Sequence, residues 1–162
     1  MKHLLAAAAA LLLADIAAAH TQTAQTVATP AGMVAPSARP AAAVVDAFHA
    51  ALRRGDTKVA LSHLADNALI YEAGGVERDR QEYASHHLGA DSAFAQAVPS
   101  TVTRRAGEAI GNVAWIASEG RTTGTYKDKA VDRVTTETMV LRRQGGAWTI
   151  VHIHWSSAAA AK

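Results

Sequence analysis

The hydrophobic residues in the first half of the chain recur at helical spacing. In one segment, which stops before Gly55, they fall on a single helix face: Val44, Val45, Phe48, Ala51 and Leu52. Asp56 then supplies the cap expected at the start of a second helix. A short apolar run over residues 68–72 predicts a strand, and a polar helix is expected over about residues 80–97.

In the second half the pattern changes to the alternation typical of strands. Four strands are expected, over residues 100–109, 113–125, 131–143 and 147–156. Short segments of turn-forming residues separate them: Gly111-Asn112, Lys127-Asp128-Lys129 and Gly145-Gly146. Helices followed by a long antiparallel meander predict an α+β fold, a curved antiparallel sheet wrapped around N-terminal helices.

The last strand carries the most distinctive residues. Strict alternation would place five of them on one face: Trp148, Ile150, His152, His154 and Ser156. Its apolar character predicts that this face borders a core or a pocket. We therefore expect the imidazoles of His152 and His154 to point inward together.

The two ends of the chain differ in character from the middle. Residues 1–19 combine Lys2, an Ala/Leu run and a small-residue cleavage site, which is typical of a secretory signal peptide. Residues 20–40 are expected to form a flexible tether, residues 41–157 the domain, and residues 158–162 a disordered tail. This organisation predicts a periplasmic or secreted bacterial protein with no stable membrane anchor after cleavage. Without cysteine, its folding does not depend on disulfides.

Charge and motif content narrow the possible functions. The formal net charge is only +2, and the basic residues occur as scattered pairs rather than as a stripe with interleaved aromatics, which disfavours nucleic-acid binding. The chain carries no nucleophile elbow, phosphate-binding loop or dinucleotide fingerprint. Hydrolase and nucleotide-dependent functions are therefore disfavoured as well.

The C-terminal motifs resemble the SnoaL-like branch of the nuclear transport factor two-like superfamily. They comprise Glu137-Thr138, Val140-Leu141-Arg142-Arg143, the Gly-Gly turn and Trp148-x-Ile150-Val151-His152-x-His154-x-Ser156. The association domain of calcium/calmodulin-dependent kinase carries a similar run, and the resemblance covers residues 41–157. It implies a cone, in which a bent sheet encloses a long helix and a pocket, and a homodimer formed through the sheet. Members of this superfamily include isomerases, dehydratases, cyclases and binding modules, so membership indicates the fold better than the function.

Four histidines are candidate metal ligands: His86, His87, His152 and His154. In the implied cone, the helix bearing His86 and His87 closes the mouth. Adjacent helical residues point about 100° apart, so one of this pair is expected to meet the strand pair. Three neutral imidazoles suit zinc or copper, and a periplasmic address favours copper. The alternative is that these are structural histidines that brace the cone through hydrogen bonds.

Six further residues are candidate contacts for a small ligand: Tyr71, Glu72, Tyr83, Trp115, Glu119 and Glu137. Each has a structural alternative, such as an ion pair for Glu119 or a strand end for Glu72. His49 and His63, on the first two helices, are interpreted as ordinary surface or packing residues.

Two functions of different classes remain open. The first is an exported protein that holds a small molecule or a metal ion in a histidine-lined pocket without turning it over, and the sequence favours this one. The second is an enzyme of the cyclase, isomerase or dehydratase kind that uses a pocket histidine as acid or base. A catalytic histidine requires an orienting group beside it and a cavity large enough for an organic substrate, whereas a metal site requires converging donors.

Overall fold

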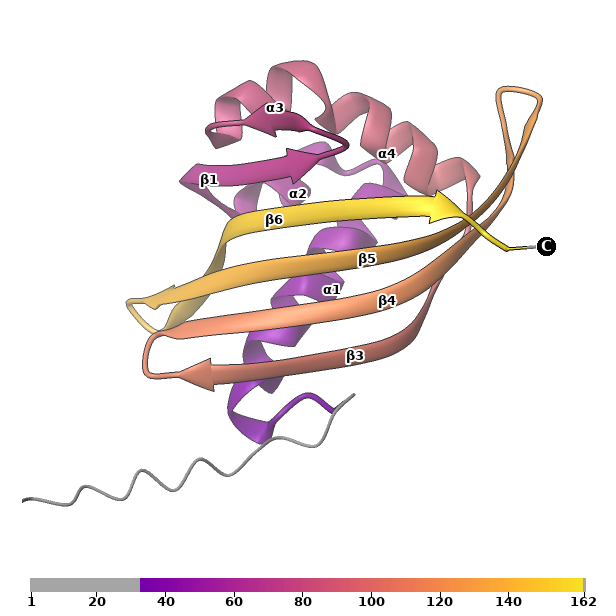
Figure 1. Ribbon diagram of the computed structural model, residues 1–162. Helices are drawn as coiled ribbons and strands as arrows, with labels where there is room; N and C mark the ends of the chain where they lie inside the picture. Colours follow the sequence, from indigo (N-terminus) through magenta and orange to yellow (C-terminus); the bar gives the residue numbers. More distant parts are fainter. Residues whose placement is uncertain (1–32, 162) are drawn as a thin grey trace, which may run out of the picture.

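The computed structural model describes residues 33–161, which form a layer of helices packed on one face of a curved sheet (Figure 1). The predicted α+β class is confirmed by this arrangement. The predicted signal peptide and residues 20–32 of the predicted tether lie outside the described residues. None of the described helices is long and apolar enough to cross a membrane.

The helical layer contains one short 3-10 helix and four α-helices. They are η1 (Pro36–Ala38), α1 (Arg39–Arg54), α2 (Thr57–Ser62), α3 (Arg80–His86) and α4 (Leu88–Ala97). Alpha-helix α1 ends at Gly55, whose φ of 76° is a left-handed conformation that glycine adopts without strain. The single helix expected over residues 80–97 is broken at His87, which separates α3 from α4.

The sheet contains six strands in the order β2-β1-β6-β5-β4-β3. They are β1 (Leu64–Glu72), β2 (Gly75–Glu77), β3 (Ser100–Ile110), β4 (Val113–Tyr126), β5 (Lys129–Gln144) and β6 (Ala147–Ala159). The sheet was expected to be antiparallel, and it departs from this at one pair of strands, because β1 runs parallel to β6. The predicted meander β3-β4-β5-β6 is antiparallel throughout.

The core lies between α1 and the concave face of the sheet. Phe48 of α1 is fully buried and stacks on Trp155 of β6, with ring centroids 6.3 Å apart. The facing strands contribute large aliphatic side chains that are also fully buried: Ile116, Met139, Leu141, Ile150 and Ile153. Burial of each such side chain contributes about 1.5–3 kcal/mol to folding, so these contacts hold the helix against the sheet.

A bulge in β6 reverses the expected orientation of its histidines. Leu141 pairs with Ile150 and Val140 pairs with His152, which leaves Val151 as an extra residue on β6. Ile150 and Ile153 therefore both face the core although they are three residues apart. The prediction that His152 and His154 point inward with Ile150 is wrong, because burying both isoleucines turns these imidazoles to the outer face.

The ends of the described region are more ordered than the sequence indicates. Val34, which falls in the predicted tether, bridges to Gly107 of β3. Ala38 of η1 is fully buried in the core. At the other end, β6 continues to Ala159, beyond the predicted domain limit.

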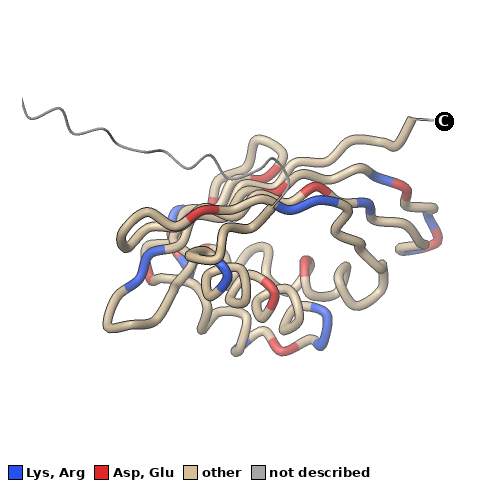
Figure 2. The backbone as a smooth tube through the Cα atoms, turned by 90° about the horizontal axis from the view of Figure 1, so that it is seen from below, with Lys and Arg blue, Asp and Glu red and all other residues tan. Residues whose placement is uncertain are grey.

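In Figure 2 basic and acidic positions are interspersed over both layers of the described residues.

Candidate functional site

A cavity of about 520 Å³ lies between α1, α4 and the strands β4, β5 and β6. Leu52, Phe94 and Trp155 form its apolar wall. Small polar residues line the sheet side: Ser100, Thr122, Thr135, Thr136, Ser156 and Ser157. The hollow forms because these short side chains occupy strand positions that, in the neighbouring core, are filled by large aliphatic side chains. Its volume falls within the range of about 300–1,000 Å³ that small-molecule sites occupy.

The cavity wall carries a paired histidine and glutamate. His49 of α1 places its Nε2 atom 2.6 Å from Oε2 of Glu137 on β5. Trp155 donates its indole N–H to the same oxygen over 2.8 Å, and the Ser118 hydroxyl lies 3.4 Å from Oε1. The side chain of Glu137 is 10% exposed and that of His49 is 29% exposed. Both residues line the cavity, and the imidazole is the more exposed member of the pair.

Glu137 is held in its ionised form. Burial on its own would raise the pKa of its carboxyl, but the His49 hydrogen bond and charge, the Trp155 hydrogen bond and the Arg105 charge together keep the pKa below its ordinary value. A carboxylate that binds Nε2 of an imidazole fixes the ring orientation and leaves Nδ1 as the second reactive nitrogen. Among the described residues no hydrogen bond occupies Nδ1 of His49.

A second acidic group lines the α4 side of the same cavity. Tyr83 donates its hydroxyl hydrogen to Oδ2 of Asp91 over 2.9 Å. Burial raises the pKa of Asp91 and also that of Glu72, to which the charge of Asp91 adds. Burial raises the pKa of Tyr83 too, so this phenol stays protonated and acts as a donor. Within the cavity the pKa of Glu137 is thus lowered while those of Asp91 and Glu72 are raised, a divergence that suits acid and base roles.

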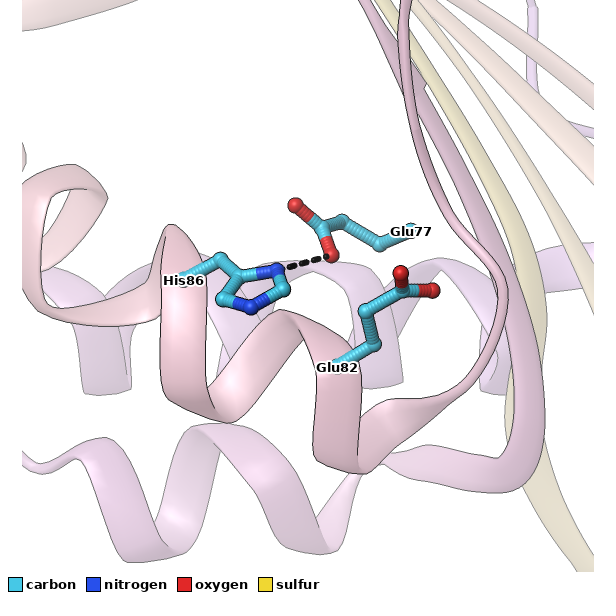
Figure 3. A group of neighbouring side chains, drawn as sticks. All are labelled: Glu77, Glu82 and His86. Atoms are coloured by element: carbon cyan, nitrogen blue, oxygen red, sulfur yellow. Dashed lines mark hydrogen bonds and ion pairs between the residues drawn. The ribbon is translucent and has the colours of Figure 1, made fainter.

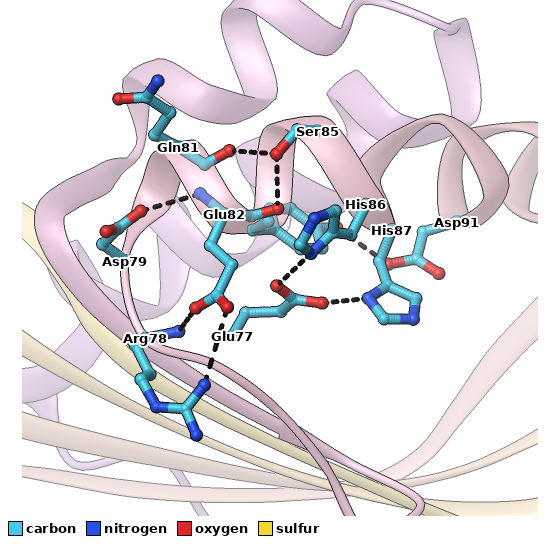
Figure 4. Close-up of polar contacts among 10 residues, drawn as sticks. Glu77, Arg78, Asp79, Gln81, Glu82, Ser85, His86, His87 and Asp91 are labelled. Carbon is cyan, nitrogen blue, oxygen red and sulfur yellow. Dashed lines mark hydrogen bonds and ion pairs between the residues drawn. The ribbon is translucent and has the colours of Figure 1, made fainter.

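The four predicted metal ligands do not converge. His86 and His87, at the end of α3, both direct Nδ1 at Glu77 of β2; the His86 contact is 3.3 Å long (Figures 3 and 4). Both reach one carboxylate because the helix ends at His86 and His87 departs from helical geometry. The expectation that only one of them faces the sheet, toward the β6 pair, is therefore wrong.

The β6 pair has different partners. The Nδ1–H of His152 donates to the backbone carbonyl of Leu69 over 2.8 Å, and His154 is exposed. Tyr71 packs edge-on against both rings, with centroids 5.3 Å and 6.2 Å away. These three side chains form an aromatic cluster on the outer sheet face, and a metal site that joins His86 or His87 to this pair is excluded by the geometry.

The six predicted ligand contacts divide between the two faces of the sheet. Glu72 and Glu137 line the cavity, and the buried Tyr83 reaches it through Asp91. Trp115 and Glu119 lie on the outer face, where Glu119 pairs with Arg104 at 3.4 Å. Together with Tyr71, these outer residues are not cavity contacts, so those three predictions are wrong.

The sequence interpretation assigned no site role to His49, Asp91 or Trp155. His49 stands four residues after the buried Val45 and three before Leu52 on α1, so helical spacing alone places it beside the core-facing stripe. Its partner is 88 residues away in the chain, and no local pattern links the two. The interpretation of His49 as an ordinary surface or packing residue is corrected by this contact.

Comparison with known proteins identifies the family of this chain. Residues 41–160 match the model of the SnoaL-like domain. A proposed ketosteroid isomerase from Shewanella frigidimarina NCIMB 400 is 39% identical, with a TM-score of 0.72, over 76% of this chain and 100% of its own. No curated protein matches the chain.

Two more distant structures share the fold alone. A proposed calcium/calmodulin-dependent protein kinase II association domain from Xanthomonas campestris is 21% identical, with a TM-score of 0.65, over 82% of this chain and 97% of its own. A proposed dehydratase of the NTF2-like family from Streptomyces avermitilis is 18% identical, with a TM-score of 0.61, over 76% of this chain and 98% of its own. The fold and the match over residues 41–160 together show that the chain belongs to the SnoaL-like domain family.

Proposed function

We propose that this chain is an enzyme that transfers a proton on a small organic molecule bound in the cavity. The observation that carries the proposal is the His49–Glu137 pair, with its 2.6 Å contact, on the wall of a cavity of about 520 Å³. This pair meets the two requirements of a catalytic histidine, an orienting group and room for an organic substrate. It therefore favours the enzyme over the binding protein, which is the reverse of the preference drawn from the sequence.

His49 is the general base in this proposal. Its Nδ1 atom accepts a proton from a carbon next to a carbonyl group, and the C–H electron pair becomes the enolate. Glu137 stabilises the imidazolium that forms, because its carboxylate already accepts the hydrogen bond from Nε2. Asp91, whose raised pKa favours the protonated form, supplies a proton to the carbonyl oxygen or to a leaving group.

The relative from S. frigidimarina supports the same reaction class. It is 39% identical over its full length and is a proposed ketosteroid isomerase, an enzyme class that moves a proton next to a ketone. The cavity combines small polar side chains with an apolar wall formed by Leu52, Phe94 and Trp155, which suits a substrate that has one polar and one apolar side. These observations support the proposal of a substrate class, ketones with an acidic α-hydrogen, rather than of one compound.

Hydrogen–deuterium exchange tests the base directly. Wild-type protein in D₂O is incubated with cyclohexanone, 2-tetralone and a 5-ene-3-ketosteroid, and loss of the α-proton signal is followed by NMR. We expect accelerated exchange for at least one ketone and a loss of about 10²–10⁴-fold in His49→Gln. His63→Gln, which changes a histidine outside the cavity lining, is the matched control and should exchange like wild type. Equal rates in His49→Gln and wild type would refute the base, and cavity binding without exchange would indicate a binding protein.

We further propose that the protein is exported and forms a homodimer through the outer sheet face. Residues 1–19 support export by their signal-like sequence. The outer face exposes large hydrophobic side chains that a partner would cover, among them Ile110, Val113, Trp115 and Val134. Light scattering of the purified protein should give twice the chain mass, and Trp115→Glu should shift it to one chain mass. A monomeric wild type, or a dimer unaffected by this change, would contradict the sheet interface.

A further inference from the structure

A group of metal-ligand side chains lies outside the cavity, where α3 faces the β1–β2 hairpin. Glu77 comes from β2, and Glu82 and His86 come from α3 at a spacing of four residues, which places both on one helix face (Figure 3). One ligand atom from each residue lies within 4.8 Å of the other two. The side chain of Glu77 is only 6% exposed, so one residue of the group is buried, whereas Glu82 and His86 are more exposed.

We propose that Glu77, Glu82 and His86 bind a divalent first-row transition-metal ion, for which Zn²⁺ is the probe. Zn–O and Zn–N bonds of about 2.0–2.2 Å in tetrahedral geometry separate neighbouring donor atoms by roughly 3.3–3.6 Å. A bound ion therefore requires a rotation of the Glu82 and His86 side chains, which are 28% and 58% exposed. Three protein ligands leave the fourth position for water, and the imidazole disfavours Mg²⁺ and Ca²⁺.

His87 holds the buried ligand in position. Its Nδ1 contacts Oε1 of Glu77, whereas Nδ1 of His86 lies on Oε2, 3.3 Å away (Figure 4). The two oxygens of Glu77 therefore have different roles, Oε2 toward the ion and Oε1 toward His87. Carboxylates that bind metals are commonly oriented by a second hydrogen-bonding residue of this kind. In this arrangement Nδ1 of His86 gives up its hydrogen and donates its lone pair to the ion.

Neighbouring groups also hold the carboxylate of Glu82 in place. The backbone N–H of Arg78 donates to Oε2 of Glu82 over 2.6 Å, and the Arg78 guanidinium is 3.5 Å from Oε1. Asp79 caps α3 by accepting the backbone N–H of Glu82 over 2.7 Å. Glu82 is thus fixed in the first turn of α3. An ion that binds its Oε1 needs to displace only the 3.5 Å contact to the Arg78 guanidinium.

The local charge balance favours a cation. Glu72 and Glu77 line one small hollow beside Tyr83 and His87, and the charge of Glu77 is one of the causes that raise the pKa of Asp91, after burial. A bound divalent ion would reduce this repulsion between carboxylates. The site is spatially separate from the proposed reaction site, because none of its three ligands lines the larger cavity.

Calorimetric titration of ZnCl₂ into EDTA-treated, tag-free full-length protein tests the site, with thermal unfolding as a second readout. We expect one Zn²⁺ per chain that raises the melting temperature, and no comparable response to MgCl₂. His86→Ala and Glu77→Gln should each weaken Zn²⁺ binding by at least tenfold. His87→Ala, which removes the orienting residue, should weaken it by about 10–100-fold.

The double variant His152→Ala/His154→Ala is the matched control and should bind Zn²⁺ like wild type. His86 is more than half exposed, so His86→Ala should keep the wild-type circular dichroism spectrum and metal-free melting temperature. Undiminished Zn²⁺ affinity in His86→Ala would overturn the site. Loss of binding only in the His152/His154 variant, or no binding by wild type, would overturn it equally.

Discussion

Replacing Glu137 by Gln removes the charge at the centre of the candidate site while keeping its shape. In the wild type, Oε2 accepts hydrogen bonds from His49 over 2.6 Å and from Trp155 over 2.8 Å. Each hydrogen bond to a charged group contributes about 1.5–3 kcal/mol, and a neutral one is about half as strong. A Gln oxygen in the same place still accepts both, so the expected loss is half of two such bonds, about 1.5–3 kcal/mol in the free energy of unfolding.

The loss should depend on pH with a defined sign. Because the pKa of Glu137 is lower in the folded than in the unfolded chain, ionisation stabilises the fold above the unfolded-state value of about 4.3. This contribution disappears as pH falls through the lower folded-state pKa. The difference between wild type and Glu137→Gln should therefore be large near pH 5 and shrink toward pH 3.

Urea denaturation followed by tryptophan fluorescence measures this difference. Glu119→Gln makes the same chemical change at an exposed carboxylate, 56% exposed and paired with Arg104, and should alter stability by less than about 0.5 kcal/mol. Equal effects of the two substitutions, or a difference that grows toward pH 3, would refute the assignment of Glu137 as a buried, ionised anchor.

Four further substitutions test other parts of the structure by the same denaturation assay. Gly107→Ala would place its Cβ 2.6 Å from the Ile116 side chain and 2.9 Å from a strand carbonyl, and should destabilise the protein by about 1–3 kcal/mol. Gly89→Ala, which has open space around the new Cβ, should instead stabilise it by roughly 0.5–1 kcal/mol; a matching loss at both positions would contradict the packing. Asp91→Asn should stabilise the protein more at pH 7 than at pH 4. The reason is that a carboxyl whose pKa is raised on folding destabilises the folded chain as pH rises above the pKa of the unfolded chain. A larger stabilisation at pH 4 than at pH 7 would show that the fold favours the ionised form of Asp91. Asp79→Ala removes the cap of α3 and should cost about 0.5–2 kcal/mol, while a neutral result would show that the cap contributes nothing.

Local sequence determines most of the secondary structure. The expected strands over residues 113–125 and 131–143 match β4 and β5 to within two residues, because turn segments with left-handed conformations end them. The three-residue strand β2 was not predicted, since so short a segment has no periodicity to read. The break at His87 was also missed, because neither a glycine nor a proline marks that position.

The amino-acid sequence by itself determined the fold class, the family and two of the carboxylates that line the cavity. Only the tertiary structure decided which histidine faces that cavity. Strict alternation predicts His152, but one extra residue at Val151 turns it outward, because Ile150 and Ile153 gain more from burial than two imidazoles would. His49 gains its role from a glutamate 88 residues away, and such a contact follows from packing between distant elements, which no local pattern encodes.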